Sequence, residues 1–480
     1  MTAPLLVGLV CYVGSRGLGD ASSVSAASVH GRILEAVTRH HKDLLPLDAS
    51  DWWGTAFVTL GLMIAAAGGI GGGGILVPLF ILVYGFPPKN AIALSNFTIV
   101  GSSITNIVLN LSKRHPNVDR PLIDWDLILV MEPLTMVGAI VGAFGSKLLP
   151  DWLLTIMLVA LLAFTTWTTL EKGISQWQKE SQQFEKEKKS LLVQATDAEV
   201  ELVEKAEATP LLQADKEADE ESAPSTSYAS NAPAPVRKSP EEQELADLID
   251  SERNTPVDKA VILTGMVVAV VVLNLLKGGG KAFPSPLGLE CGGSGYWAIQ
   301  GLVILVVLAV SWHMRNVLIE KWKLKKRLHY AYAVGDVEWN ERNTIIYPAI
   351  CFTAGLFAGM FGVGGGIVKG PLMLQMGVHP LVASNTVAVM IMFTSVAGTA
   401  MYMAFGTLVL DYGFALFVVG LLATVVGQFG VSYLVEKYRR VSLVSFSIGA
   451  VVALSTLLMG VQSIFSLMST TPEPKAHVCD

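Results

Sequence analysis

Two charged side chains, Lys369 and Glu132, lie inside segments that are otherwise apolar. An ionised lysine in the middle of a membrane helix costs about 2.5–3.5 kcal/mol on insertion scales, so it should face a cavity or a partner. In a cavity, Lys369 can attract an anion, or it can lose its proton and couple proton movement to the anion. The alternative is a long side chain that reaches the membrane interface.

Glu132 directly precedes Pro133, a residue that breaks helices. A carboxylate in such a place is by default a functional residue, and we expect it to couple protons to transport. A salt bridge to Lys369 is the structural alternative. If both groups are ionised and close together, the pair can open when an anion binds the lysine.

Two glycine-rich runs interrupt apolar segments, at residues 68–78 and 362–371. Non-helical backbone at membrane depth survives only where it is buried in protein or lines a wet cavity. N–H groups of glycines can converge on an oxyanion, and half-helices beginning at Ile75 and Ile367 would add their positive ends. The alternative is that the glycines only let helices pack closely. The candidate donors are Gly71, Gly72, Gly73, Gly74, Gly364, Gly365 and Gly366.

The two runs share a layout that indicates an internal repeat. Ile70 precedes Pro78 by as many residues as Val363 precedes Pro371, and each run continues into Gly-x-x-Pro. A Ser-Asn pair follows in both, with a shift of three residues. Paired Gly/Pro-interrupted segments favour a transporter binding site, whereas hydroxyls and amides also form hydrogen bonds between membrane helices. The candidates from these pairs are Ser95, Asn96, Ser384 and Asn385.

The composition indicates a polytopic membrane protein. The chain has 480 residues, of which 52% are hydrophobic and 15% charged, and its mean hydropathy is +0.51. We expect an all-α protein with two homologous halves, each with a Gly-broken discontinuous or re-entrant helix, and roughly ten spans. The chain has no P-loop ending, nucleophile–base pair or metal spacing, so we expect no enzyme, no cofactor and no nucleic acid partner.

Shifts in composition divide the chain. Loops of basic character lie two spans apart and predict a cytoplasmic side. A basic turn at 436–440 leaves open whether each broken segment crosses once, crosses twice or forms a re-entrant hairpin, and so whether the repeats are inverted or parallel. The expected parts are an N-terminal tail with or without a targeting signal (1–50), a first membrane repeat (51–172), an acidic cytoplasmic loop that is helical and then disordered (173–258), a linking helical hairpin (259–314), a basic cytoplasmic loop (315–343), a second membrane repeat (344–466) and a C-terminal tail (467–480).

These motifs resemble the sulfite exporter TauE/SafE family. Gly-Gly-Gly-Gly-Ile-Leu-Val-Pro with Gly-Phe-Pro-Pro, repeated after a central loop, is similar to that family, and residues 114–126 and 149–152 resemble its plant-type branch. The resemblance covers about residues 53–172 and 315–465. It implies a multi-pass transporter of small anions such as sulfite or sulfur-containing organic acids. Lys369 and Glu132 depart from the family pattern.

We therefore expect a secondary transporter, an exporter of small anions that works by alternating access of two repeats. An uncoupled anion channel and a membrane scaffold or receptor that acts through its acidic loop are the alternatives. The expected partners are a small anion and the lipid bilayer of the plasma membrane or an endomembrane. Proton coupling and a homo-oligomer are left open.

Overall fold

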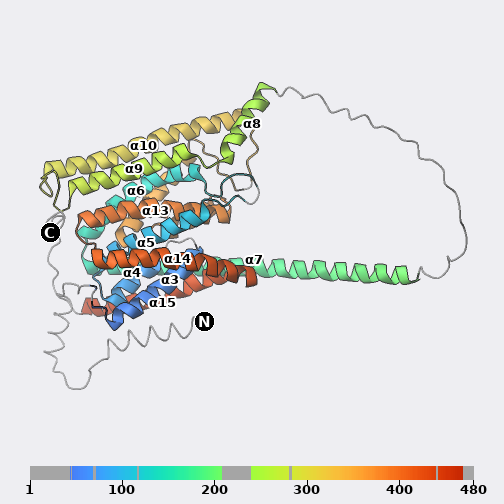
Figure 1. Ribbon diagram of the computed structural model, residues 1–480, viewed down its shortest axis with the longest axis horizontal. Coiled ribbons are helices and arrows are strands. Elements are labelled where there is room, and N and C mark those ends of the chain that lie inside the picture. The colour runs from blue at the N-terminus through green and yellow to red at the C-terminus, as the bar shows by residue number, and fades with distance from the viewer. Residues whose placement is uncertain are drawn as a thin grey trace, which may run out of the picture.

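The computed structural model describes residues 44–468, apart from 45, 69–71, 116–117, 208–238, 280–283, 334 and 439–441. These described residues form helices and no strand, which confirms the all-α polytopic prediction. Most of the helices run side by side (Figure 1). They are α3 (Ala49–Gly68), α4 (Gly73–Leu79), the π-helix η1 (Phe80–Tyr84), α5 (Pro88–Asn110), α6 (Trp125–Leu148), α7 (Asp151–Glu207), α8 (Pro240–Arg253), α9 (Val257–Lys277), α10 (Ser294–Arg327), α11 (Asn343–Phe361), α12 (Gly366–Gln375), α13 (Pro380–Ala404), α14 (Leu410–Tyr438) and α15 (Ser442–Met468).

Eight of the described helices are long and apolar enough to cross a membrane, where the sequence predicts about ten spans. The glycine breaks explain part of the difference, because the helical pieces after them are short. α12 has 10 residues and is therefore about 15 Å long, half of a hydrocarbon core of about 30 Å. The apolar piece Gly73–Tyr84 is similarly short.

α11 and α12 form a hairpin whose two ends lie at the same end of the bundle. The ring of His379, just before α13, lies 5.8 Å from that of His115 in the loop before α6. A Cβ atom built on Gly335, in the loop that leads to α11, would lie 2.8 Å from the backbone nitrogen of His379. α12 therefore returns to the side from which α11 enters.

α3 and η1 form the corresponding hairpin at the opposite end. The hydroxyls of Thr55 and Tyr84 are 2.9 Å apart, and the Tyr84 ring lies 6.0 Å from that of Tyr412. Tyr412 is at the start of α14, and α13, with 25 residues, separates that end from His379. The two hairpins therefore enter the bundle from opposite ends.

The same geometry places the basic segments together. The backbone nitrogen of Ser442, at the start of α15, donates to a carboxylate oxygen of Glu180 at 3.0 Å. Glu180 lies near the middle of α7, and α7 leads out of the bundle to the right in Figure 1. The start of α15 is thus at the same end as the loops before α6 and α11.

One residue distinguishes the two short segments. Pro78 precedes Gly85 by seven residues, whereas Pro371 precedes Gly377 by six. The first segment contains the π-helix η1, which accommodates an extra residue within a helix. Gly85 and Gly377 then both end their segments with positive φ, 78° and 87°.

The acidic segment between the halves differs from the expected disorder. Residues 240–253 form α8, because Ser239 accepts a hydrogen bond from the Glu242 nitrogen while the Glu242 carboxylate accepts one from the Ser239 nitrogen. This capping box satisfies two backbone groups that a helix start otherwise leaves unpaired. Residues 208–238, and the tails at 1–43 and 469–480, lie outside the described residues.

Candidate functional site

A buried ion pair joins three helices in the middle of the bundle. The ammonium of Lys369 on α12 lies 2.8 Å from Oε2 of Glu132 on α6 and donates to Oγ1 of Thr394 on α13 at 2.7 Å. The Thr394 hydroxyl in turn donates to Oε1 of Glu132 at 2.5 Å. Both charged side chains are 0% exposed, so Lys369 does not reach the interface.

Helix geometry places Lys369 at this point. It lies in the first turn of α12, and helical side chains point back toward the N-terminus. Its Cε lies 3.4 Å from the position that a Cβ atom of Gly365 would take. The glycine therefore leaves room for the lysine to reach Glu132.

The two half-helices begin in the same way. Gly72 caps α4 with φ 75° and ψ −9°, and Gly365 caps α12 with φ 72° and ψ −9°. These left-handed values favour glycine at both positions. The half-helices begin at Gly73 and Gly366, somewhat earlier than the expected starts at Ile75 and Ile367. Gly74 is buried in the first turn of α4, and Gly71 lies outside the described residues.

The tips of the two hairpins touch through their backbones. A Cβ atom on Gly73 would lie 2.3 Å from Cα of Val363 and 2.7 Å from the carbonyl oxygen of Gly362. That oxygen accepts a hydrogen bond from Ser95 on α5 at 2.8 Å. Gly364, with φ 68°, lies against Ile99 and Ile391. Close packing is thus one role of this glycine run, as the alternative interpretation states.

The structure separates the two Ser-Asn pairs. Ser95 contacts the second glycine run, and buried Asn96 donates to the carbonyl oxygen of Ile92 at 3.1 Å. Asn385 donates to the carbonyl oxygen of Leu381 one turn earlier, at 2.7 Å, in the first turns of α13. Ser384 lies beside it and is partly buried. On α13 it is Thr394, further along the helix from this pair, that accepts a hydrogen bond from Lys369.

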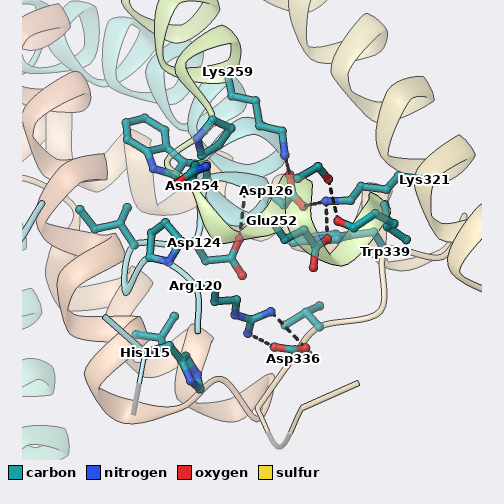
Figure 2. Close-up of a pocket in the computed structure, with 18 of the residues that line it drawn as sticks. His115, Arg120, Asp124, Asp126, Glu252, Asn254, Lys259, Lys321, Asp336 and Trp339 are labelled. Atoms are coloured by element: carbon teal, nitrogen blue, oxygen red, sulfur yellow. Dashed lines mark hydrogen bonds and ion pairs between the residues drawn. The ribbon is translucent and has the colours of Figure 1, made fainter. Parts of the chain in front are cut away.

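A second polar site lies where the loop before α6 meets α8, α9 and α10. It surrounds a cavity of about 380 Å³ (Figure 2). Ionisable side chains from separate segments of the chain face one another there. They include His115, Arg120, Asp124, Asp126, Glu252, Asp258, Lys259, Lys321, Lys325 and Asp336, and we call this site the vestibule.

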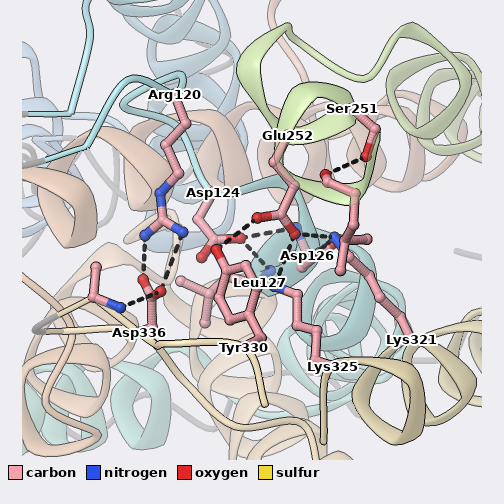
Figure 3. A network of polar contacts seen from close by, with 12 residues as sticks. Arg120, Asp124, Asp126, Leu127, Ser251, Glu252, Lys321, Lys325, Tyr330 and Asp336 are labelled. Carbon is pink, nitrogen blue, oxygen red and sulfur yellow. Dashed lines mark hydrogen bonds and ion pairs between the residues drawn. The ribbon is translucent and has the colours of Figure 1, made fainter. Parts of the chain in front are cut away.

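Ion pairs connect the vestibule residues (Figure 3). Asp126 pairs with Lys259 and, at 3.0 Å, with Lys321. Lys321 and Lys325 both contact Oε1 of Glu252, at 2.7 and 2.8 Å. On the other side of the cavity, Arg120 pairs with Asp336.

Burial and charge shift the pKa values of the vestibule groups. Burial raises the pKa of the Glu252 carboxyl, but the charges of Lys321 and Lys325 outweigh it and lower this pKa to about 2. Burial and the charge of Asp126 raise the pKa of Asp124, which caps α6 by accepting hydrogen bonds from two backbone nitrogens. Burial, helped by the positive charge of Arg120, lowers the pKa of His115. Glu252 is therefore a carboxylate at neutral pH.

Sequence reasoning missed the vestibule as a site. The loop before α6 stood out only through its family resemblance, and Glu252 belongs to a segment expected to be disordered. Within the described residues, no group of three His, Cys, Asp or Glu side chains could hold a metal ion.

Comparison with known proteins identifies the family. The family model described as "Sulfite exporter TauE/SafE" matches residues 51–196 and 260–456, which is well over half of the chain. The chain belongs to the sulfite exporter TauE/SafE family. Members of the TauE/SafE family are integral membrane transporters.

Individual TauE/SafE relatives agree with this assignment. Sulfite exporter TauE/SafE family protein 3 of Arabidopsis thaliana is 29% identical over 86% of this chain and 79% of its own length. Family protein 5 of the same plant is 28% identical over 83% of this chain and 80% of its own length. The probable membrane transporter protein YunE of Bacillus subtilis (strain 168) is 35% identical over 20% of this chain and 32% of its own length. No solved structure matches the chain.

The TauE/SafE match contains the buried ion pair but only part of the vestibule. Glu132, Lys369 and Thr394 all lie inside the matched ranges. The unmatched residues 197–259 include α8, and therefore Glu252. The vestibule thus combines TauE/SafE family residues with a helix outside the family match.

Proposed function

We propose that this protein is a secondary transporter that exports small anions, sulfite or sulfur-containing organic anions among them. The observation that carries the proposal is the buried pair of Lys369 and Glu132, beside the place where hairpins from opposite ends of the bundle meet. A cation that is buried in a membrane protein and paired with a single carboxylate can exchange that partner for another anion. Its family membership supports the transport function.

The geometry supports a simple exchange. A substrate anion that reaches Lys369 takes the place of Glu132, which then lies buried without a positive partner. A carboxylate in that state is costly, so Glu132 binds a proton and moves with it. The Thr394 hydroxyl, which donates to Glu132 in the closed pair, is available to donate to the substrate instead. One proton thus moves with each anion.

The two hairpins support alternating access. Each begins and ends at its own end of the bundle, and their tips touch at Gly73 and Val363. We infer that the halves are inverted repeats, and that opening one hairpin exposes Lys369 to one side while the other keeps the opposite side closed. Because the described basic loops before α6 and α11 lie at the α8 end, we infer that this end is cytoplasmic.

Transport by the purified protein tests the proposal. The full chain is reconstituted in liposomes, and uptake of sulfite, sulfate, thiosulfate, sulfonates and carboxylates is measured. We expect saturable uptake of at least one of these anions, stimulated by a pH gradient. Uptake that grows linearly with concentration would indicate a channel, and no uptake of any anion contradicts the proposal.

The Glu132→Gln variant tests proton coupling separately. Glutamine keeps the shape of the side chain and one accepting oxygen, but it cannot change its charge. We expect the pH dependence of uptake to disappear in this variant. Transport with the pH dependence of the natural protein would remove Glu132 from the mechanism.

A further inference from the structure

The carboxylate of Glu252 occupies a cradle of three donors in the vestibule. Oε1 lies 2.7 Å from the ammonium of Lys321 and 2.8 Å from that of Lys325. Oε2 accepts a hydrogen bond from the hydroxyl of Tyr330 at 3.0 Å. Two ammonium groups and a phenol around one anionic group make a built site for a small oxyanion (Figure 3).

The helix that carries Glu252 buries none of its own residues. Outside the cradle, Glu244 pairs with Arg327 at 2.8 Å, Arg253 pairs with Asp119 at 2.7 Å, and Arg114 donates to the carbonyl oxygen of Arg253. The apolar side chain of Leu248 is only partly buried, at the edge of the cavity. The Ile249 side chain is exposed. Exposed ion pairs contribute little and are screened by salt, so α8 is held mainly by the contacts of Glu252 in the cradle.

A cavity beside the cradle and the limits of the TauE/SafE match both distinguish α8 from the helices that it contacts. The cavity of about 380 Å³ lies beside the cradle, and its size is that of a small-molecule site. α10, which supplies Lys321 and Lys325, lies within the TauE/SafE match, whereas α8 lies outside it. The cradle residues Lys321, Lys325 and Tyr330 therefore lie within the TauE/SafE match, whereas Glu252, which fills the cradle, lies outside it.

We propose that Lys321, Lys325 and Tyr330 form an access site for a small anion with a carboxylate, sulfonate or sulfite group, and that α8 is a built-in competitor whose Glu252 fills this site. The identity of the competing anion as a transport substrate rests on the proposed function. A sulfonate or sulfite oxygen set can meet the same donors that the two carboxylate oxygens of Glu252 meet now. Binding of the anion releases α8 from the vestibule.

Binding to the purified full-length protein tests the site directly. Titration calorimetry in detergent measures the affinity for sulfite and for methanesulfonate in the natural protein and in Glu252→Gln. If α8 leaves the cradle about 10% of the time, removing its carboxylate tightens the apparent affinity about tenfold. Equal affinities in the two proteins would overturn the proposal.

Two further variants make the result specific. Asp250→Asn removes the same charge from α8 at an exposed side chain that pairs with exposed Arg253 outside the cradle, so it should leave the affinity unchanged. Lys325→Gln in the Glu252→Gln background should abolish the gain, because it removes one cradle donor. A gain that survives Lys325→Gln places the anion elsewhere, for example at Lys369, and contradicts the proposal.

Release of α8 has its own measurement, which does not depend on any change at Glu252. Spin labels at Glu241→Cys on α8 and Lys323→Cys on α10 report the distance between the helices. Methanesulfonate should lengthen this distance more than chloride at equal ionic strength, and an equal effect would overturn the proposal. If transport fails in liposomes while binding and release occur, only the proposed function is lost; if transport occurs without them, only the vestibule site is lost.

Discussion

At the scale of single residues, the main feature is the buried ion pair of Lys369 and Glu132. A charge inside an apolar segment is rare, so it can be recognised from the sequence. An opposite charge in another apolar segment can be recognised in the same way and is its expected partner. Thr394 could not be selected in the same way, because neutral hydroxyls are common between membrane helices. Ser384 and Asn385 were selected from the duplication, but their depth along α13 depends on where the half-helix ends, which the sequence does not reveal.

The ion pair predicts an asymmetric response to mutation. Glu132→Gln leaves the ammonium of Lys369 buried without its counter-charge, and breaking a buried pair in this way destabilises a protein by about 3–5 kcal/mol. The double variant Glu132→Gln with Lys369→Met removes both charges and should recover much of that stability, but it should lose uptake because no ammonium remains to bind the anion. Thermal unfolding in detergent and liposome uptake check the two parts. A double variant less stable than Glu132→Gln alone would contradict this account.

The contact between hairpin tips predicts a sharp difference between two glycines. In Gly73→Ala, the new methyl group meets the backbone of Val363, which cannot turn aside as a side chain could, and we expect a loss of about 1–3 kcal/mol together with lower uptake. Gly370→Ala on α12 is the control, since a Cβ atom there meets nothing within 4 Å. Alanine in a helix is favoured over glycine by about 0.5–1 kcal/mol, so this control should unfold at a slightly higher temperature.

At the scale of elements, the structure adds what local patterns leave undecided. The glycine runs predict breaks, and the breaks are there at Gly72 and Gly365, but the length of each following piece decides whether it crosses the membrane. The π-helix η1 and the helix α8 were not predicted. The π-helix η1 depends on one additional residue in the segment that follows the first glycine run. The helix α8 depends on a capping box at Ser239 within an acidic, proline-containing stretch.

The docking of α8 should respond to acid only far below neutral pH. The pKa of docked Glu252 is about 2, below the ordinary value of 4.5. Docking is therefore fully stabilised above about pH 4.5 and is lost as the pH falls toward 2. The spin-label distance between α8 and α10 should be the same at pH 7.5 and pH 5.5 and should lengthen at pH 3. A change between the first two values would mean that another group, and not Glu252, controls α8.

At the scale of the whole molecule, the opposed hairpins fix the orientation of the remaining helices. Composition predicts a polytopic protein and the positive loops predict its sides, but the sequence could not separate a re-entrant hairpin from a crossing helix. The distinction between a re-entrant hairpin and a crossing helix depends on contacts such as Thr55 with Tyr84 and His115 with His379. These residues are distant along the chain from the glycine breaks. The vestibule was unpredictable for the same reason, because its residues come from several distant segments.

The orientation predicts where an inserted epitope is accessible. An epitope placed between α7 and α8 should bind antibody only after the cells are permeabilised, because the basic turns at that end predict the cytoplasmic side. An epitope after Leu287, in the connection between α9 and α10, lies at the opposite end and should bind antibody on intact cells or on the lumenal side of an endomembrane. Binding of both epitopes on the same side would contradict the crossing of the membrane by α9.

α8 ends at Arg253 and α9 begins at Val257, so only three residues connect the helix that carries Glu252 to the membrane bundle. A short tether of this kind keeps its end group at a local concentration in the millimolar range, whatever the amount of protein in the cell. A free anion must therefore reach a comparable concentration before it displaces Glu252. The transporter would be inactive at low internal anion concentration and active once the anion accumulates. The length of the linker between α8 and α9 would then set the anion concentration at which transport begins.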